Sequence, residues 1–180
     1  MPRPTRTRPP LDTAALERLA LRYVERFATT RARLAAYLER KLGERGWDGE
    51  SRPDTREIAE RMAERGYIDD RAYAEQRAGA MLRRGLGGRR VVQALRHHGI
   101  ESDDMETARE QIADGGFASA LAFARKRRIG PFAGQEADRS QREKHVAAMV
   151  RAGHPLEVAR KIASMKPGEE IDETVAPDGY

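Results

Sequence analysis

Apolar side chains recur at intervals of three and four residues through most of the chain. Leu16, Leu19 and Tyr23 form the first such stripe, and Leu34 and Leu38 belong to the second. This spacing is typical of helices with one buried face. Because no segment alternates apolar and polar residues with the period of two found in β-strands, we expect an all-α protein.

Seven further stripes follow, so the pattern predicts nine helices in all. The sixth of these is expected to begin at Ser102, and Phe117 is expected to lie in a separate seventh helix. The apolar markers of the seven helices are, in order, Ile58 and Met62, Tyr73 and Met81, Val91 and Leu95, Met105 and Ile112, Phe117 and Leu121, Val146 and Met149, and Val158 and Ile162.

A glycine followed by a bulky residue separates several of these helices, and we call this arrangement a joint. Glycine readily adopts the left-handed conformation that ends a helix. In RGYIDDRAYA, Tyr67 is then expected to fold back onto the helix that ends, and Asp69 or Asp70 to cap the next one. The joints are Gly46-Trp47, Gly66-Tyr67, Gly99-Ile100 and Gly153-His154.

The joints occur in frame with a longer repeat of helix, turn, helix, joint and third helix. The repeats are expected at 13–67, 68–114 and 115–166, and the third contains the inserted stretch IGPFAGQEADRS. A three-helix unit this short buries little surface alone, so the pattern predicts tandem three-helix, helix-turn-helix-like repeats stacked in an elongated, curved array. The alternative is one irregular bundle whose turns share common capping chemistry.

The two ends differ in charge. Residues 1–12 combine prolines with Arg3, Arg6 and Arg8, which predicts a disordered basic arm. Residues 167–180 are acidic, contain two prolines and have no helical stripe, which predicts a disordered acidic tail.

The composition limits the kind of core, the chemistry and the location that we expect for this protein. Charged residues make up 35% of the chain and aromatic residues 6%, which favours thin helical layers over one thick core. The absence of cysteine excludes disulfides, thiolate metal sites and cysteine nucleophiles. No apolar run approaches the roughly 20 residues of a membrane span, and the first residues lack the apolar stretch of a signal peptide. We therefore expect a cytoplasmic protein without membrane contact.

Positive charge is concentrated in one window. Between Arg77 and His98 there is no acidic residue, and two of the arginines open a helix, where the helix dipole disfavours cations by up to about 1 kcal/mol each. Such a cluster indicates an acidic partner, either a phosphate backbone or a carboxylate-rich protein face, although solvated faces of an Arg-rich protein would give the same pattern. The candidate binding residues are Arg77, Arg83, Arg84, Arg89, Arg90 and Arg96.

A second basic block, Arg125, Lys126, Arg127 and Arg128, ends a predicted helix, where cations are locally favourable. We include it among the candidates. Aromatic residues are not interleaved with the arginines of the first window, so any contact with nucleic acid is expected to involve mainly the backbone and to depend on salt.

Catalytic and metal chemistry find little support. His97 and His98 are adjacent and point about 100° apart on a helix, which makes them a poor metal pair. GLGGRR resembles a phosphate loop but lacks a preceding strand and the Lys-Ser/Thr ending. No nucleophile with a base is visible, so an enzyme is the least favoured class, and we expect no metal and no cofactor.

With these residues identified, the chain resembles the RecX family, regulatory proteins of the RecA recombinase. The resemblance is carried by GYIDDRAYA and by GLGGRRVVQALRHHGI, and Thr30, Leu34 and Leu38 take the places of the family's Ser, Leu and Leu. The third repeat matches only in outline. The signature positions with an expected structural role are Gly66, Tyr67, Asp69, Asp70, Gly87 and Gly99.

The resemblance implies tandem three-helix repeats and a non-enzymatic protein. It also implies binding to RecA, chiefly its filament on single-stranded DNA, and modulation of recombinase and ATPase activity. We expect a monomer with at most weak backbone binding to DNA.

Two other functions remain open. One is an independent DNA-binding protein with Arg89–Arg96 as a recognition helix, in which Gln93 is the one good base reader. The other is a helical scaffold for an acidic protein unrelated to DNA.

Overall fold

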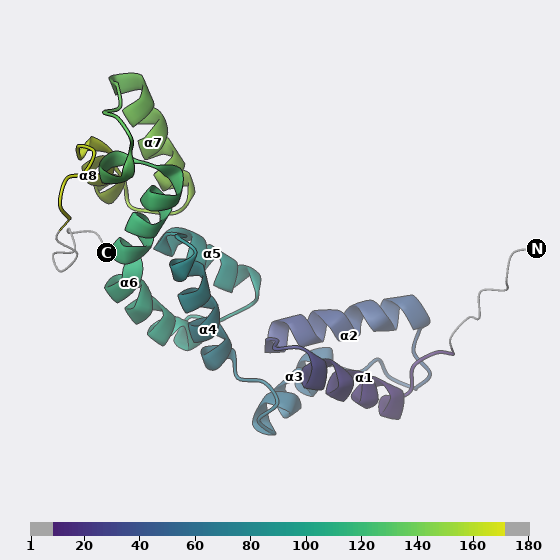
Figure 1. Ribbon diagram of the computed structural model, residues 1–180. Helices are drawn as coiled ribbons and strands as arrows, with labels where there is room; N and C mark the ends of the chain where they lie inside the picture. The colour runs from purple at the N-terminus through teal and green to yellow at the C-terminus, as the bar shows by residue number, and fades with distance from the viewer. Residues whose placement is uncertain (1–8, 172–180) are drawn as a thin grey trace, which may run out of the picture. The chain divides into compact units, whose positions relative to one another are not determined.

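The computed structural model describes residues 9–171 of the chain. Over this range the fold is all helical, which confirms the predicted class, and its extended pairing is one isolated bridge between Leu11 and Trp47. In chain order (Figure 1) the elements are α1 (Thr13–Arg26), α2 (Arg31–Arg45), α3 (Thr55–Glu64), α4 (Asp70–Arg83), α5 (Gly88–His97), the 3₁₀ turn η1 (Asp103–Met105), α6 (Glu106–Arg127), the 3₁₀ turn η2 (Gly130–Phe132), α7 (Arg139–Arg151) and α8 (Leu156–Ser164).

The described helices form two compact units. The first unit extends up to Tyr73 and includes His98–Ile100, so it holds α1, α2, α3 and the joint after α3. Its core is built from the first two apolar stripes together with residues of α3, and Trp47 packs against it. Buried members of this core include Leu16, Ala20, Leu34, Leu38, Leu42, Ile58 and Met62.

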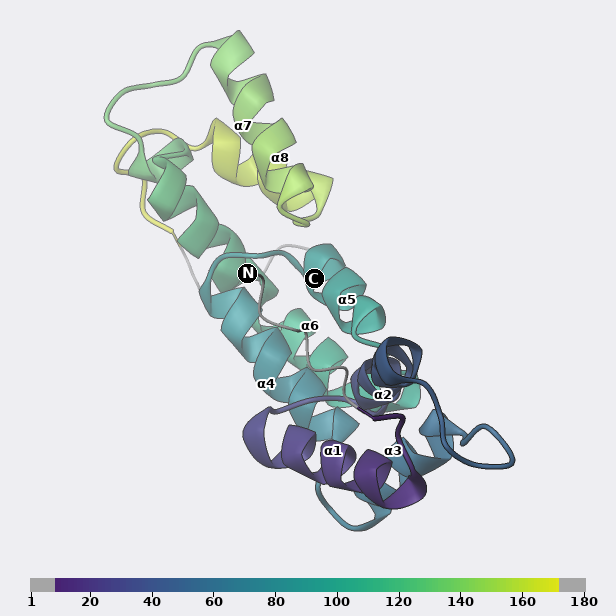
Figure 2. The same cartoon turned by 90° about the vertical axis from the view of Figure 1, so that its right-hand side faces the viewer.

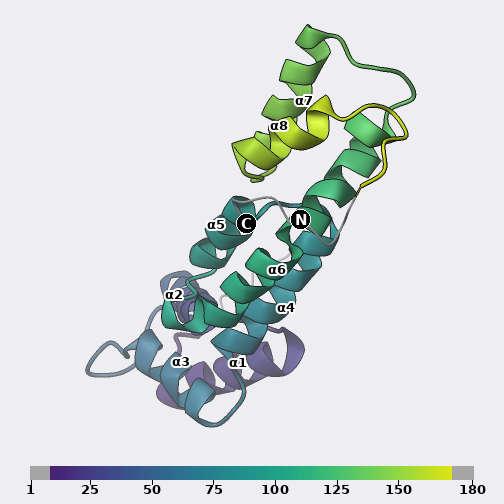
Figure 3. The same cartoon turned by 90° about the vertical axis from the view of Figure 1, so that its left-hand side faces the viewer.

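The second unit comprises Ala74–His97 and the chain from Glu101 onward. Within it, α6 lies beside α4 and α5, and its C-terminal half packs against α7 and α8 (Figures 2 and 3). The core at this end contains residues of α6, α7 and α8, among them Phe117, Leu121, Met149, Val158 and Ile162.

The glycine joints form as predicted. Gly46, Gly66, Gly99 and Gly153 all have φ between 75° and 99°. At Gly66 the glycine N–H donates to Ala63 O at 2.8 Å and the next N–H donates to Met62 O at 2.9 Å, which is the Schellman ending of a helix. At this joint Tyr67 is 49% exposed, while the following residue, Ile68, is buried.

The expected sixth and seventh helices are one helix, α6, of 22 residues. The Gly115-Gly116 pair near its middle would favour a break on intrinsic propensity. Here Gly116 is buried, and a Cβ added at Gly115 would contact Leu82 Cδ1 at 3.7 Å. That separation is an ordinary van der Waals contact, so this position does not require glycine. Burial of Ala108, Phe117 and Leu121 on both sides of the pair outweighs the low propensity of the glycines.

Part of each segment expected to be disordered belongs to the described residues. Residues 1–8 and 172–180 lie outside the described residues. Leu11, expected in the basic arm, is fully buried and pairs with the chain at Gly46, while Asp12 caps α1. At the other end, Gly168 N–H donates to Pro131 O at 3.0 Å and Ile171 packs against the core of the second unit. Backbone hydrogen bonds and the apolar contacts of Leu11 and Ile171 hold these residues in the structure.

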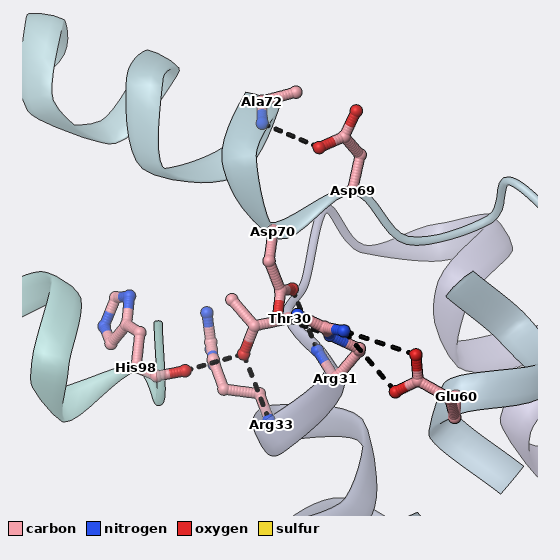
Figure 4. A network of polar contacts seen from close by, with 8 residues as sticks. All are labelled: Thr30, Arg31, Arg33, Glu60, Asp69, Asp70, Ala72 and His98. Carbon is pink, nitrogen blue, oxygen red and sulfur yellow. Dashed lines mark hydrogen bonds and ion pairs between the residues drawn. The ribbon is translucent and has the colours of Figure 1, made fainter. Parts of the chain in front are cut away.

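The two adjacent aspartates cap two different helices (Figure 4). Asp69 Oδ1 accepts a hydrogen bond from Ala72 N at 2.8 Å, which caps α4 as expected. The Asp70 side chain is 3% exposed and accepts from the Arg31 backbone N at 3.0 Å and from Arg31 Nε at 2.9 Å. Asp70 therefore satisfies the start of α2, a helix 39 residues earlier in the chain.

The joint after α5 is attached to the same point (Figure 4). Thr30, which is fully buried, donates from Oγ1 to His98 O at 2.7 Å and accepts from Arg33 N at 3.1 Å. A Cβ added at Gly99 would lie 2.2 Å from Ala32 Cβ. Thr30 and Gly99 therefore hold His98–Ile100 against the beginning of α2 within the first unit.

No helix within residues 9–171 is both long enough and apolar enough to cross a lipid bilayer.

Replacing Asp70 should destabilise the first unit more than replacing Asp69. Asp70→Ala removes the buried acceptor of the Arg31 backbone N–H and of Arg31 Nε, and we expect a loss of about 2 kcal/mol in the free energy of unfolding. Asp69→Ala removes one exposed cap and should cost about 1 kcal/mol or less. Urea unfolding followed by Trp47 fluorescence, which reports on the first unit, measures both; equal losses would contradict the assignment.

Candidate binding groove

The segment GLGG ends α4 and starts α5 in a tightly packed environment. Gly85 has φ +86°, and a Cβ there would lie 2.9 Å from Phe123 N. A Cβ at Gly88, the first residue of α5, would lie 2.4 Å from Ile112 Cγ2. Both glycines are therefore required by close contact with α6, which fixes where α5 begins.

Gly87 meets the joint between α7 and α8 backbone to backbone. Its N–H donates to Ala152 O at 2.9 Å, and the Arg89 N–H donates to Gly153 O at 3.3 Å. A Cβ on Gly87 would lie 2.2 Å from Gly153 C, and a Cβ on Gly153 would lie 2.7 Å from Arg90 N. Only glycines permit this approach, so the signature residue Gly87 positions α5 against α7.

His154, immediately after this contact, is fully buried. Its Nε2 lies 3.1 Å from Gly85 O, to which it donates, and its ring meets Phe123 edge-on. Burial lowers the pKa of His154, while the hydrogen bond to the Gly85 carbonyl opposes that shift. A neutral imidazole thus ties the α7–α8 joint to the end of α4.

A groove of about 730 Å³ lies between α5 and the end of α7. Val91 and Leu95 of α5 are fully buried, which leaves the opposite face of the helix directed outward. The groove is lined by Gly88, Arg89, Arg90, Val92, Gln93 and Arg96 of α5 and by Val150, Arg151 and Gly153.

The groove carries four arginines and no carboxylate among its lining residues. Within residues 9–171, none of Arg89, Arg90, Arg96 and Arg151 forms an ion pair within 4 Å; Arg90 Nη1 donates instead to Gln93 Oε1 at 3.2 Å. In the first unit, by contrast, Arg52 pairs with Glu39 at 2.6 Å. The charge of the groove is therefore available for an external anion.

The remaining arginines of the acid-free window do not line the groove. Arg77 and Arg83 are exposed on α4. Arg84 is also exposed, and its carbonyl oxygen accepts a hydrogen bond from Lys126 Nζ at 2.9 Å. The structure thus brings together three of the six candidates of this window.

The second basic block makes local contacts. Arg125 lies 4.8 Å from the centre of the Phe132 ring, and Arg127 lies 5.7 Å from that of Phe123. Arg128 adopts the left-handed conformation at the end of α6, with φ 55°. These contacts give the block a structural role at the turn between α6 and η2.

Arg151 was missed by sequence reasoning. It lies 55 residues beyond Arg96 and ends a predicted helix, a position that attracts cations for local reasons. The sequence did contain one signal that could have identified Arg151. Arg151 lies shortly before the joint at Gly153, and basic residues also lie just before the other joints.

The described residues contain no group of three or more His, Asp or Glu side chains that could hold a metal ion. The side chains that line the groove offer cationic hydrogen-bond donors and the apolar surface of Val92 and Val150.

Residues 69–108 match the family model described as RecX, second three-helix domain. This range contains α4 and α5, and α5 supplies most of the residues that line the groove.

Relatives cover nearly the whole chain. Regulatory protein RecX of Myxococcus xanthus (strain DK1622) is 30% identical over 166 residues, covering 84% of this chain and 86% of that protein. Regulatory protein RecX of Halorhodospira halophila is 32% identical over 160 residues, with 88% and 91% covered. The crystal structure of RecX from Lactobacillus salivarius superposes with a TM-score of 0.65 at 18% identity, covering 83% and 92%, which supports the same fold.

Acidification should weaken the second unit through His154. The folded pKa lies below the ordinary value of 6.5, so below that pH the unfolded chain binds the proton first and stability falls. Between pH 7.5 and 5.5 we expect a loss of about 1 kcal/mol in the free energy of unfolding, measured by urea titration with circular dichroism. His154→Gln should flatten this dependence, whereas His97→Gln should not; an unchanged slope in His154→Gln would exclude the role.

Proposed function

Because this chain belongs to the RecX family, we propose that it binds the RecA recombinase and modulates, mostly by inhibition, its ATPase and strand-exchange activities. It acts as a regulatory protein and not as an enzyme. Its partner is the RecA filament assembled on single-stranded DNA. It works as a cytoplasmic monomer.

The observation that carries this proposal is the groove with four arginines that have no carboxylate partner within the described residues. Phosphate and carboxylate groups both match guanidinium geometry. A recombinase filament on DNA presents both kinds of anion at close quarters. The groove therefore fits the assembled filament better than either component alone.

The strength of such a surface comes from several contacts together. A single exposed ion pair contributes about 0–1 kcal/mol, so four arginines act mainly by steering and by their sum. Binding is accordingly sensitive to ionic strength. We propose that the arginine face bridges neighbouring subunits of the filament, which impedes strand exchange or filament growth.

The contacts of α5 disfavour sequence-specific DNA recognition. Gln93 is the one good base reader on α5, and its Oε1 already accepts a hydrogen bond from Arg90. Weak binding to the DNA backbone remains compatible with the groove.

Reversing charge in the groove should reduce inhibition. We expect Arg89→Glu combined with Arg90→Glu to raise the concentration needed for half-inhibition of RecA's DNA-dependent ATPase at least tenfold, since two attractions become repulsions. The matched control is Arg18→Glu with Arg22→Glu, two exposed arginines of α1 that give the same change in net charge. Equal inhibition by the folded groove variant and the wild-type chain would refute the assignment.

A pull-down separates the three functions that the sequence left open. The full chain is immobilised and offered bare single-stranded DNA, RecA alone, or RecA assembled on single-stranded DNA. We expect the assembled filament to be retained best, and the double groove variant to retain less of it. Best retention of bare DNA would support the DNA-binding protein, and retention of none would support a scaffold for another acidic partner.

A further inference from the structure

A second groove lies along α7 and α8, and we call it the α7–α8 groove. The two helices pack side by side (Figures 2 and 3), and Met149, Val158 and Ile162 between them and α6 are fully buried. The groove has a volume of about 640 Å³. Its apolar lining consists of Val146, Ala147 and Val150 of α7 and Leu156 and Ala163 of α8.

The spacing of these residues places the groove along both helices. Val146 and Val150 are four residues apart, and Leu156 and Ala163 are seven apart, so each pair lies on one face of its helix. Leu156 is 44% exposed although its side chain is large and apolar. A single exposed leucine is common, but this one borders an apolar groove. A groove between two helices suits the apolar face of a third helix.

Arginines accompany this apolar lining. The charged residues that line the groove are Arg139, Arg142, Arg160 and one carboxylate, Glu143. Within residues 9–171, Arg160 forms no ion pair within 4 Å. Arg139 pairs with Glu143 at 3.2 Å, and Arg142 pairs with Glu136 at 3.9 Å. These four side chains are 42–91% exposed, so their pairs are weak and can be exchanged for carboxylates of a partner.

The charge of the two helices as a whole is complementary to an acidic partner. From Arg139 to Lys166 there are seven Lys or Arg residues and two Glu residues, an excess of five positive charges. This excess equals the formal net charge of the whole chain, +5. An apolar groove in such surroundings favours an apolar segment that is flanked by carboxylates.

The lining of the α7–α8 groove favours protein over nucleic acid. None of the lining residues is aromatic, so bases have no ring on which to stack. A phosphate backbone would pair with the arginines but leave the apolar lining uncovered. Val150 lines both the α7–α8 groove and the arginine groove beside α5, so one partner can contact both.

We propose that the α7–α8 groove binds an amphipathic acidic helix of a protein partner. Its apolar side chains cover Val146, Val150 and Leu156, and its carboxylates pair with the arginines. RecA supplies this helix; that identification rests on the proposed function, whereas the chemistry of the occupant does not. The arginine groove accepts either phosphate or carboxylate, so the α7–α8 groove adds a contact that only the protein part of a filament can make.

The chemistry of the occupant is tested with a peptide of about 14 residues and the isotope-labelled full-length chain. The peptide carries leucine at positions i, i+3, i+4 and i+7 and glutamate or alanine elsewhere; the control peptide has the same composition with its leucines spread around the helix. We expect the first peptide to shift the amide signals of Ala147, Leu156 and Ser164 and to bind at least about fivefold more tightly than the control, because only it presents an apolar face. Equal binding of the two peptides, or shifts confined to other residues, would overturn the proposal.

Two substitutions at exposed positions block the groove without entering the core. Leu156→Glu removes the apolar contact and repels the peptide, and a carboxylate is favourable at this first residue of α8. Ala147→Arg fills the groove while retaining its positive charge. We expect each to weaken peptide binding about tenfold, whereas Phe27→Glu, at a 49% exposed residue of the first unit, leaves binding unchanged.

Circular dichroism establishes that the variants are folded, and unchanged peptide binding by both folded groove variants would refute the assignment. Sedimentation of the free chain tests a different occupant. A concentration-dependent dimer that Leu156→Glu dissociates would identify a second copy of the chain in the groove and would also overturn the proposal.

Retention of RecA separates this proposal from the proposed function. We expect immobilised Leu156→Glu to retain at least about fivefold less RecA than the wild-type chain and the same amount of bare single-stranded DNA. Weakened inhibition by Arg89→Glu/Arg90→Glu together with unchanged retention of RecA by Leu156→Glu would keep the proposed function and remove RecA from the α7–α8 groove. Peptide binding by a wild-type chain that retains no RecA would keep the acidic occupant and remove the proposed function.

Discussion

The backbone contact between Gly87 and Gly153 is the constraint on which the second unit depends. Two chain segments approach so closely that neither position has room for a side chain, and hydrogen bonds from Gly87 and Arg89 secure the contact. This contact sets α5 beside the end of α7, which creates the groove, and it buries His154 directly behind it. The groove is thus a consequence of how the start of α5 packs against the joint between α7 and α8.

The arginines of the first unit and those of the groove differ in whether they form ion pairs within the described residues. In the first unit, arginines pair with carboxylates of the same unit: Arg31 pairs with Asp70 and Glu60, and Arg52 pairs with Glu39. The hydrogen bonds from Arg52 and Thr55 lower the pKa of Glu39. At the groove, Arg89 and Arg90 stand at the start of α5, where the dipole opposes them, whereas Arg96 and Arg151 lie in the last turns of their helices. The helix dipole does not explain the placement of Arg89 and Arg90, which is why we propose an external anion.

The residues by which the chain resembles its relatives mostly hold the fold. Asp70 satisfies a distant helix start, Gly66 and Gly99 close helices in the left-handed conformation, and Gly87 allows the close contact. The cations proposed to bind lie between such positions and are oriented by them. A pattern of structural residues can therefore identify the family, while the groove is found only from the tertiary structure.

The sequence alone predicted the features that local interactions determine. Apolar spacing predicted the helices, and the ability of glycine to adopt positive φ predicted the joints. The remaining features of the fold and the groove depend on contacts between segments far apart in the sequence. Local patterns do not show which of these segments meet. Burial of residues on both sides of Gly115 keeps α6 continuous, Asp70 caps a helix 39 residues away, and Arg151 joins the arginines of α5 across a groove that no local pattern encodes. Periodicity specifies a face of each helix, but only tertiary structure decides which faces come together.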